Sequence, residues 1–458
     1  MKFGRSVVLV VTVGALISGG CRAPMLASPS IGNWMPAKDA SPETSRDFPA
    51  RVSKTMPIEL ATILRLAGER ALEIQLAKAT AAAAAAEHDI AASKWLPTLT
   101  PRLTLVRHED RLQSTQGALL DVDKQNAFGG AGVSLQFNVA DAWFSSIVAE
   151  QRAYAARLGI RAAQHVNVGA AVRLYYDLLE VTASLQVAQR AVTQARELVT
   201  VQETSEKAGR ALMADVLQAR AYLASAIGGQ ASVEADVVEK TARLVGLLVL
   251  RADTILVPAE TEVAPIEFHE ADLPMDILLE KAMASRPEVA QAHSLVAAAE
   301  SEVDRLNWSW LVPELHIGAE YGSYGSNYSR THGREDYFAD LQWHLAFGTF
   351  AKSRHADAKF REQQSRLQIV VQNVRTDIRI AVARVRSAKA RVIAARDEIA
   401  AASAALELEK LRHKAGKSLF LVVLFAERVH TEARIKLIRA ICVQNRAQFE
   451  LHRLVGVN

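Results

Sequence analysis

The strongest constraint on this chain is a stretch of 64 residues, from Phe350 to His413, that contains neither proline nor glycine. As one α-helix it would be roughly 95 Å long at 1.5 Å per residue. Apolar residues recur every seven positions along it, which is typical of coiled-coil packing. The two heptad positions hold Val371, Ile378, Val385, Val392, Ile399 and Leu406, and Val374, Ala381, Ala388, Ala395 and Ala402. Such a helix cannot bury itself in one globular domain, so we expect it to line a rod or tube of neighbouring helices.

The same pattern occurs earlier in the chain, so the sequence is duplicated. Lys207-Ala208-Gly209-Arg210 and Lys414-Ala415-Gly416-Lys417 lie 207 residues apart, and Leu135-Gln136-Phe137 and Leu341-Gln342-Trp343 lie 206 apart. Glycine can end a helix in the left-handed conformation, so we expect turns at Gly209 and Gly416. Helices over about 212–250 and 419–454 then run back.

The duplication predicts two repeats, 56–252 and 275–458, joined by a proline-containing, acidic linker at 253–274. In each repeat we expect a helix, two strands, a very long helix, a turn and a helix. The first helix of the first repeat is predicted over about 57–94, with the alanine run 81–86 inside it, because alanine is the best helix former.

Residues of alternating polarity predict four strands, each with one apolar and one polar face. Their expected ranges are about 98–107, 131–139, 314–322 and 336–347. About ten residues suffice for a tilted strand to cross a membrane, and tryptophan and tyrosine cluster near these segments as in an interfacial belt. Four strands cannot close a barrel with a lumen, so a transmembrane barrel would need several chains. The alternative is a small soluble sheet.

The N-terminus has the pattern of a secretory signal peptide over 1–20, with Lys2 and Arg5 before a twelve-residue apolar run. That run is too short to span a hydrocarbon core of ~30 Å. Small residues lead to Cys21 and resemble a bacterial lipobox, in which the cysteine is acylated; the alternative is an ordinary signal peptide with an incidental cysteine. Residues 21–55 are expected to form a tether.

Composition and motifs argue against several other functions. Lys and Arg number 54 and Asp and Glu 50, and no basic stripe is interleaved with aromatics, so nucleic-acid binding is not favoured. The two cysteines cannot build a disulfide framework or a four-thiolate metal site, and Cys442 is expected to be buried. No HExxH, CxxC or GxSxG motif occurs. We therefore expect no enzyme, no cofactor and no metal site.

The duplication, the prolines before strands, Arg286-Pro287-Glu288-Val289 and the two glycine turns together resemble the TolC/OprM-type outer-membrane efflux protein family, in its lipoprotein branch. The resemblance implies a mainly α fold with a small β part. It implies a homotrimer, whose 12-stranded outer-membrane β-barrel continues into a periplasmic α-helical coiled-coil barrel. The first repeat departs from the family because Arg70-Ala71-Leu72 stands where a proline is usual.

The resemblance also implies a function. Such proteins are passive exit ducts of tripartite pumps for small molecules such as drugs or metal ions. They sit in outer-membrane lipid, here lipid-anchored, with a long periplasmic portion. Their partners are a periplasmic membrane-fusion adaptor protein and an inner-membrane transporter of RND or ABC type. Two alternatives stay open: a type I secretion duct for a protein substrate, and a non-conducting, lipid-anchored periplasmic coiled-coil scaffold.

Site residues follow from the same resemblance. Relatives often carry acidic residues six and nine positions after the second turn glycine, where this chain has Val422 and Phe425. With Leu421, and with Asp215 nearby, these are expected to form a hydrophobic periplasmic gate. The alternative is that they only pack helix ends together. The basic turns are the expected adaptor-docking tips, formed by Lys207, Ala208, Gly209, Arg210, Lys414, Ala415, Gly416 and Lys417.

Overall fold

The computed structural model describes residues 54–260, 263–327, 329–343 and 348–456. The predicted signal peptide, Cys21 and most of the predicted tether lie outside the described residues. The elements of the first repeat are β1 (Lys54–Ile58), α1 (Leu60–Arg70), α2 (Leu72–Ser93), β2 (Thr98–Gln113), β3 (Leu119–Asn138), α3 (Val139–Lys207) and α4 (Met213–Leu247). Those of the linker and second repeat are β4 (Thr254–Pro258), the 3-10 helix η2 (His269–Asp272), α5 (Met275–Ser285), α6 (Pro287–Ser309), β5 (Glu314–Asn327), β6 (Arg330–Gln342), α7 (Gly348–Lys414) and α8 (Phe420–Val455).

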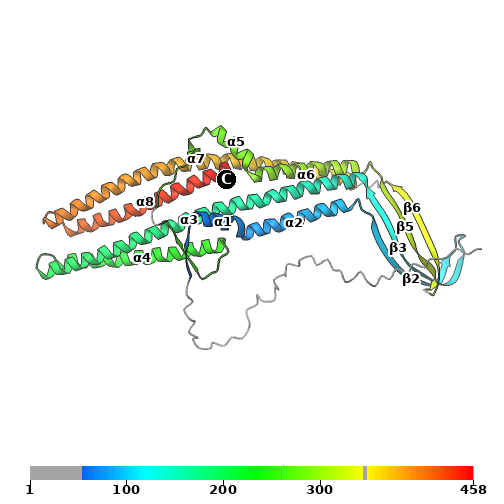
Figure 1. The fold of residues 1–458 in the computed structure, drawn as a ribbon, viewed down its shortest axis with the longest axis horizontal. Helices are drawn as coiled ribbons and strands as arrows, with labels where there is room; N and C mark the ends of the chain where they lie inside the picture. Colours follow the sequence, from blue (N-terminus) through cyan, green and yellow to red (C-terminus); the bar gives the residue numbers. More distant parts are fainter. Residues whose placement is uncertain (1–53, 261–262, 328, 344–347, 457–458) are drawn as a thin grey trace, which may run out of the picture. The chain divides into compact units, whose positions relative to one another are not determined.

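The two repeats have the same order of elements, as the sequence predicts. Helices α1 and α5 both have 11 residues, α3 and α7 have 69 and 67, and α4 and α8 have 35 and 36. Helix α4 packs along α3 and α8 along α7, and α8 also contacts α3 (Figure 1).

Most heptad positions of α7 are buried, and Val371 and Ile399 are half-buried, which confirms the coiled-coil prediction. Val374, Ile378 and Val385 are almost fully enclosed, and alanines take the adjacent positions Ala381 and Ala388. These small side chains let α8 approach α7 closely. Because α7 packs on few neighbouring helices, a narrow apolar stripe along it is sufficient. The long helices are therefore held by contacts with each other and with the shorter helices.

The predicted single helix over 57–94 is wrong. Residues 54–58 form β1, and α1 and α2 are separated at Ala71, whose ψ of 138° is extended. Arg286 makes the same break between α5 and α6, with ψ 121°, and Pro287 follows it. The first repeat carries no helix breaker there, but the break lets Ile63 on α1 and Ile74 on α2 both be buried. Tertiary burial thus overrides local helix propensity.

A small parallel sheet, which the sequence did not indicate, joins the two ends of the first repeat. Strand β1 pairs with β4, with Lys54 opposite Thr254 and Ile58 opposite Pro258. Residues 54 and 55 thus belong to a strand and not to the tether, and the linker also supplies a strand. Ile58 and Leu256 are buried in a core with Tyr175, where they hold both segments against α3.

The second sheet has four antiparallel strands in the order β2-β3-β5-β6. Three strands are longer than predicted: β2 continues to residue 113, β3 begins already at residue 119, and β5 continues to residue 327. The added residues are mostly polar and extend the hairpins. Strand β6 runs from 330 to 342 and so ends before the predicted 347; residues 344–347 lie outside the described part. Among the described helices, none has a stretch long and apolar enough to cross a membrane.

Candidate channel surfaces

The predicted alternation in the four-stranded sheet places all odd-numbered residues near its helical end on one apolar face. The register sets Leu99 opposite Val133, and Val133 opposite Ala319, which is opposite Tyr337. This apolar face is exposed in the single chain; Leu103 and Tyr337 are 75% and 78% exposed. Exposed apolar area of this extent marks a surface that another molecule or a membrane covers.

Ion pairs limit this apolar face toward the β2–β3 hairpin. On the same odd-numbered face Arg107 lies 3.6 Å from Asp123, and Arg111 lies 3.1 Å from Asp121. The apolar positions of β2 therefore run from Leu99 to Leu105, roughly 20 Å along the strand at ~3.3 Å per residue. That length is somewhat shorter than the apolar band of about 25 Å found on transmembrane β-barrels.

The opposite, even-numbered face of the sheet is polar. Arg102 pairs with Glu320 at 2.5 Å, and Gln136 donates a hydrogen bond to Glu314 at 2.9 Å. His316, which the sequence predicts on the polar face, lies 3.4 Å from Asp340. The two faces thus differ as a lipid-facing surface and a water-facing surface would.

Glycines on the polar face make room for an aromatic side chain. Gly130 and Gly322 are opposite each other in the register, and Phe128 beside them is only 7% exposed. A Cβ on Gly130 would come within 2.7 Å of the Gly322 Cα and 2.9 Å of the Phe128 ring. Arg102 stacks over the same ring at 4.9 Å. Close backbone approach explains why these positions hold glycine.

The two outer strands of this sheet, β2 and β6, each pair on one side only within the described residues. Their outer edges have 16 and 13 residues. Unpaired edges of this length are templates for pairing with another strand.

An ion-pair cluster fixes the junction between the sheet and the helices. Strand β3 continues directly into α3, and Asn138 accepts a hydrogen bond from the Asp141 N–H at 3.0 Å as the N-cap. Asp141 in turn pairs with Lys94 at 2.7 Å and with Arg305 on α6. Partial burial raises the pKa of Asp141, but hydrogen bonds from Lys94 and Arg305 outweigh it and lower that pKa below its ordinary 3.8. The carboxylate thereby joins α2, α3 and α6 where the strands begin.

The Arg286-Pro287-Glu288 motif has a structural role. The Arg286 Nε donates to the Leu454 carbonyl at 3.1 Å, at the C-terminal end of α8, where a cation is favoured. Pro287 is the first residue of α6. The motif therefore anchors the end of α8 to the break between α5 and α6.

The two predicted tips are exposed turns with the same hydrogen bonds. Gly209 and Gly416 have φ of 68° and 70°. The Arg210 N–H donates to the Ser205 carbonyl at 2.8 Å, and the Lys417 N–H to the Arg412 carbonyl at 2.8 Å. All eight predicted tip residues are exposed.

Three of the four predicted gate residues, Leu421, Val422 and Phe425, are exposed at the start of α8. Leu421, Val422 and Phe425 are 56%, 39% and 65% exposed on the first turns of α8. Their neighbours Phe420 and Leu424 are buried against Ala219 and α3. The three exposed residues thus lie on a face that no described part of the single chain covers.

Asp215 is engaged elsewhere. It is half-buried at the start of α4, where its carboxylate accepts a hydrogen bond from the Leu212 N–H at 3.2 Å. A carboxylate in the first turn of a helix is stabilised by the helix dipole. Asp215 therefore has a capping role in the single chain, beside any role in a gate.

The sequence did not reveal the charged contacts between α3 and α8. Arg446 pairs with Asp177 and lies 3.1 Å from Glu180, which also pairs with Arg439 at 3.0 Å. Burial lowers the pKa of Arg446. The seven-residue spacing of Arg439 and Arg446 was the only available signal, and it does not indicate which helix holds the acidic partners.

Three solved structures with the same fold are membrane proteins, and two of them are described as outer-membrane proteins. The fold matches the outer membrane channel CmeC of Campylobacter jejuni at TM-score 0.77 and 16% identity, over 87% of this chain and 85% of that one. It matches a membrane protein of Pseudomonas aeruginosa at TM-score 0.77 and 17% identity, over 87% of this chain and 93% of that one. It matches VceC of Vibrio cholerae, an outer membrane protein, at TM-score 0.75 and 16% identity, over 87% and 96%. The predicted fold class, mainly α with a small β part, is confirmed.

Residues 278–457, from within α5 to beyond α8, match the family model described as outer membrane efflux protein. The resemblance predicted from the sequence is thereby confirmed for the second repeat. This family is one of efflux proteins and not of enzymes, in agreement with the absence of catalytic motifs from the sequence. No curated protein sequence matches the chain.

Proposed function

We propose that this protein is the outer-membrane channel of a tripartite efflux pump and works as a homotrimer. The observation that carries the proposal is the four-stranded sheet, with an exposed apolar face, a polar face and two unpaired edges. Within the sheet, β2 and β6 run in opposite directions. Strand β6 of one copy can therefore form an antiparallel pair with β2 of the next copy. Three copies give 12 strands, which close a barrel and leave no free edge.

The two faces of the sheet then have distinct environments. The apolar face contacts lipid, and the polar face lines a water-filled lumen. A non-conducting scaffold in water does not account for Leu103 and Tyr337, because it leaves that face uncovered. The long helices α3 and α7 continue from the strands and form the wall of a periplasmic tunnel.

The ends of the tunnel suit a gate and a docking surface. Exposed Leu421, Val422 and Phe425 from three copies form an apolar constriction, which can exclude water and ions. The basic turns at 207–210 and 414–417 bind a periplasmic adaptor protein, which connects the duct to an inner-membrane transporter of RND or ABC type. Small molecules such as drugs or metal ions pass without a catalytic step. Acylation at Cys21 adds a lipid anchor to the outer membrane.

The test is single-channel recording of the detergent-extracted protein in a planar lipid bilayer. The proposal predicts discrete conductance steps from a protein that migrates as a trimer before heating and as a monomer after heating. A folded trimer that stays silent, both as wild type and with the gate residue Phe425 replaced by alanine, would favour the scaffold.

A further inference from the structure

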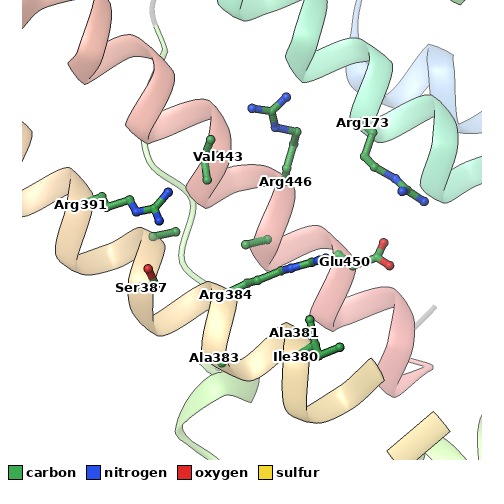
Figure 2. A pocket seen from close by; sticks show the side chains of 12 residues that line it. Arg173, Ile380, Ala381, Ala383, Arg384, Ser387, Arg391, Val443, Arg446 and Glu450 are labelled. Carbon is green, nitrogen blue, oxygen red and sulfur yellow. The ribbon is translucent and has the colours of Figure 1, made fainter. Parts of the chain in front are cut away.

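A cavity of about 590 Å³ between α3, α7 and α8 is lined by arginines (Figure 2). Arg173 comes from α3, Arg384 and Arg391 from α7, and Arg446 from α8. Its remaining lining is mostly aliphatic, with Ile380, Val443 and several alanines between the arginines. The cavity therefore combines an apolar floor with cationic sides.

Two of the charged side chains that line the cavity, Arg446 and Glu450, are already paired, so Arg384, Arg391 and Arg173 are the cations that matter for a ligand. Glu450, which also lines it, makes a two-point pair with Arg453, with hydrogen bonds of 3.3 and 2.9 Å. Asp177 and Glu180 are paired with Arg446. Among the described residues, no ion pair to a carboxylate is found for Arg384 or Arg391, and both are exposed. The Arg173 Nε donates to a backbone carbonyl, that of Gly169, at 3.3 Å, and the charge of Arg173 helps to lower the pKa of Glu450.

The opposite face of α8 is covered by the linker. The Asn445 side chain donates to the Ala264 carbonyl at 2.9 Å, and the Phe268 N–H donates to Gln448 at 3.3 Å. At 100° per residue, Arg446 and Glu450 project from the side of α8 opposite to Asn445 and Gln448. In the proposed tunnel of three copies, linkers placed on the outside would not fill the bore, and the cavity would then open toward the interior.

We propose that this cavity is a transit site for amphiphilic organic anions, in which a carboxylate or sulfonate is attached to an apolar ring system. Guanidinium groups bind such anions through paired, charge-assisted hydrogen bonds. The aliphatic floor contacts the ring, and the volume is in the range of sites for small organic ligands. The location of the site inside a tunnel rests on the proposed function; the binding itself does not.

Equilibrium dialysis against the detergent-solubilised protein measures the binding directly. The probe is 1-naphthoate, with 1-naphthylmethylammonium as a cation of matched shape and acetate as an anion without the ring. We expect 1-naphthoate to bind and the other two to bind at least about tenfold more weakly, as expected when one charge-assisted contact or the ring burial is lost.

The variant is the double substitution Arg384→Gln/Arg391→Gln, and the control is Arg386→Gln, an exposed arginine of the same helix that does not line the cavity. The double variant is expected to weaken 1-naphthoate binding about tenfold, and the control to leave it unchanged. If the double variant does not form trimers, the substitution Arg384→Lys/Arg391→Lys is used instead. It keeps both positive charges but replaces the planar guanidinium groups, so we expect a loss of affinity for 1-naphthoate that is smaller than about tenfold. Equal binding of the two naphthyl probes, or equal binding by wild type and variant, overturns the proposal.

Block of the bilayer current by 1-naphthoate then tests the location of the site. Block that the double variant weakens supports a site inside the tunnel. Binding in dialysis by a protein that never conducts contradicts the channel and leaves the anion site standing. Conduction without any binding of 1-naphthoate contradicts the anion site and leaves the channel standing.

Discussion

Val249 and Gly456 lie 207 residues apart, at equivalent positions of the two repeats just beyond the ends of α4 and α8. Both have positive φ, 52° and 77°. The Val249 N–H donates to the Gly246 carbonyl at 3.3 Å, and the Gly456 N–H to the Arg453 carbonyl at 3.2 Å. The duplicated turn thus has glycine in one copy and a β-branched residue in the other, although the left-handed conformation is strained for valine.

Val249→Gly is expected to stabilise the protein. Glycine relieves the strain of a β-branched residue at positive φ, and it loses little burial because Val249 is 44% exposed. We expect the free energy of unfolding to rise by about 0.5–1 kcal/mol, since extra chain entropy in the unfolded state offsets part of the gain. Denaturant unfolding followed by circular dichroism measures it. The matched control, Gly456→Val, should destabilise, because a Cβ there would overlap the Ser285 side chain.

Phe425→Ala should enlarge the resting conductance of the channel. The side chain is 65% exposed in the single chain and, in the proposed trimer, narrows the constriction with its two symmetry mates. The adjacent Phe420 is 3% exposed and packs near Leu424, so Phe420→Ala should cost about 3–5 kcal/mol of stability. Planar-bilayer recording of both variants separates the roles. A Phe425→Ala conductance equal to wild type would show that this residue does not restrict the pore.

Cysteines at Ala208 and Ala415 should crosslink to an adaptor protein in cells with a working pump. Both positions are exposed at the turns. The native Cys442 does not interfere, because it is fully buried and burial raises its pKa to about 12, which keeps the thiol protonated. The control is a cysteine at Ala235, which is exposed on α4 away from the turns. Adducts from Ala235 but not from the turns would contradict the docking proposal.

Asp141→Asn should destabilise the protein at pH 7 but not at strongly acidic pH. The folded-state pKa of Asp141 lies below its ordinary 3.8. The carboxylate therefore contributes fully to stability at pH values above its ordinary pKa. This contribution is lost as the pH falls through the lowered pKa of the folded state. We expect a loss of about 2 kcal/mol at pH 7, because Lys94 and Arg305 lose a charged partner. Unfolding curves at pH 7 and pH 2.5 measure the difference, and Asp397→Asn, at an exposed site of α7, is the neutral control.

Gly130→Val should prevent correct assembly of the four-stranded sheet. A Cβ at that position would collide with the backbone of β5 at Gly322, so the strands could not keep their register. Gly333→Val is the matched control, because nothing lies within 4 Å of a Cβ there. The amount of heat-dissociable trimer in outer-membrane extracts measures assembly. Equal amounts from both variants would show that the close approach at Gly130 is not required.

Periodic residues allowed the sequence to predict most of the fold. The heptads of α7, the alternation in β5 and β6 and the turns at Gly209 and Gly416 all depend on contacts with a fixed sequence spacing. The break at Ala71 and the β1–β4 pair could not be predicted in the same way. They depend on burial of Ile63, Ile74 and Leu256, which involves segments as far apart as 200 residues.

The candidate surfaces were predictable to a different extent. The tip and gate residues lie close to the turn glycines, so the duplication locates them. The arginine-lined cavity combines residues of α3, α7 and α8, and no short motif connects Arg173 with Arg384. Only the packing of α8 between the two long helices brings these side chains together.

The equivalence of the two glycine turns has a consequence for stoichiometry. Each chain presents two basic loops with the same backbone hydrogen bonds, one from each repeat. A ring of three chains therefore offers six nearly equivalent contact points, alternating between the two loop sequences. A partner that recognises the backbone conformation could bind in six copies, whereas one that distinguishes Arg210 from Lys417 would bind in three.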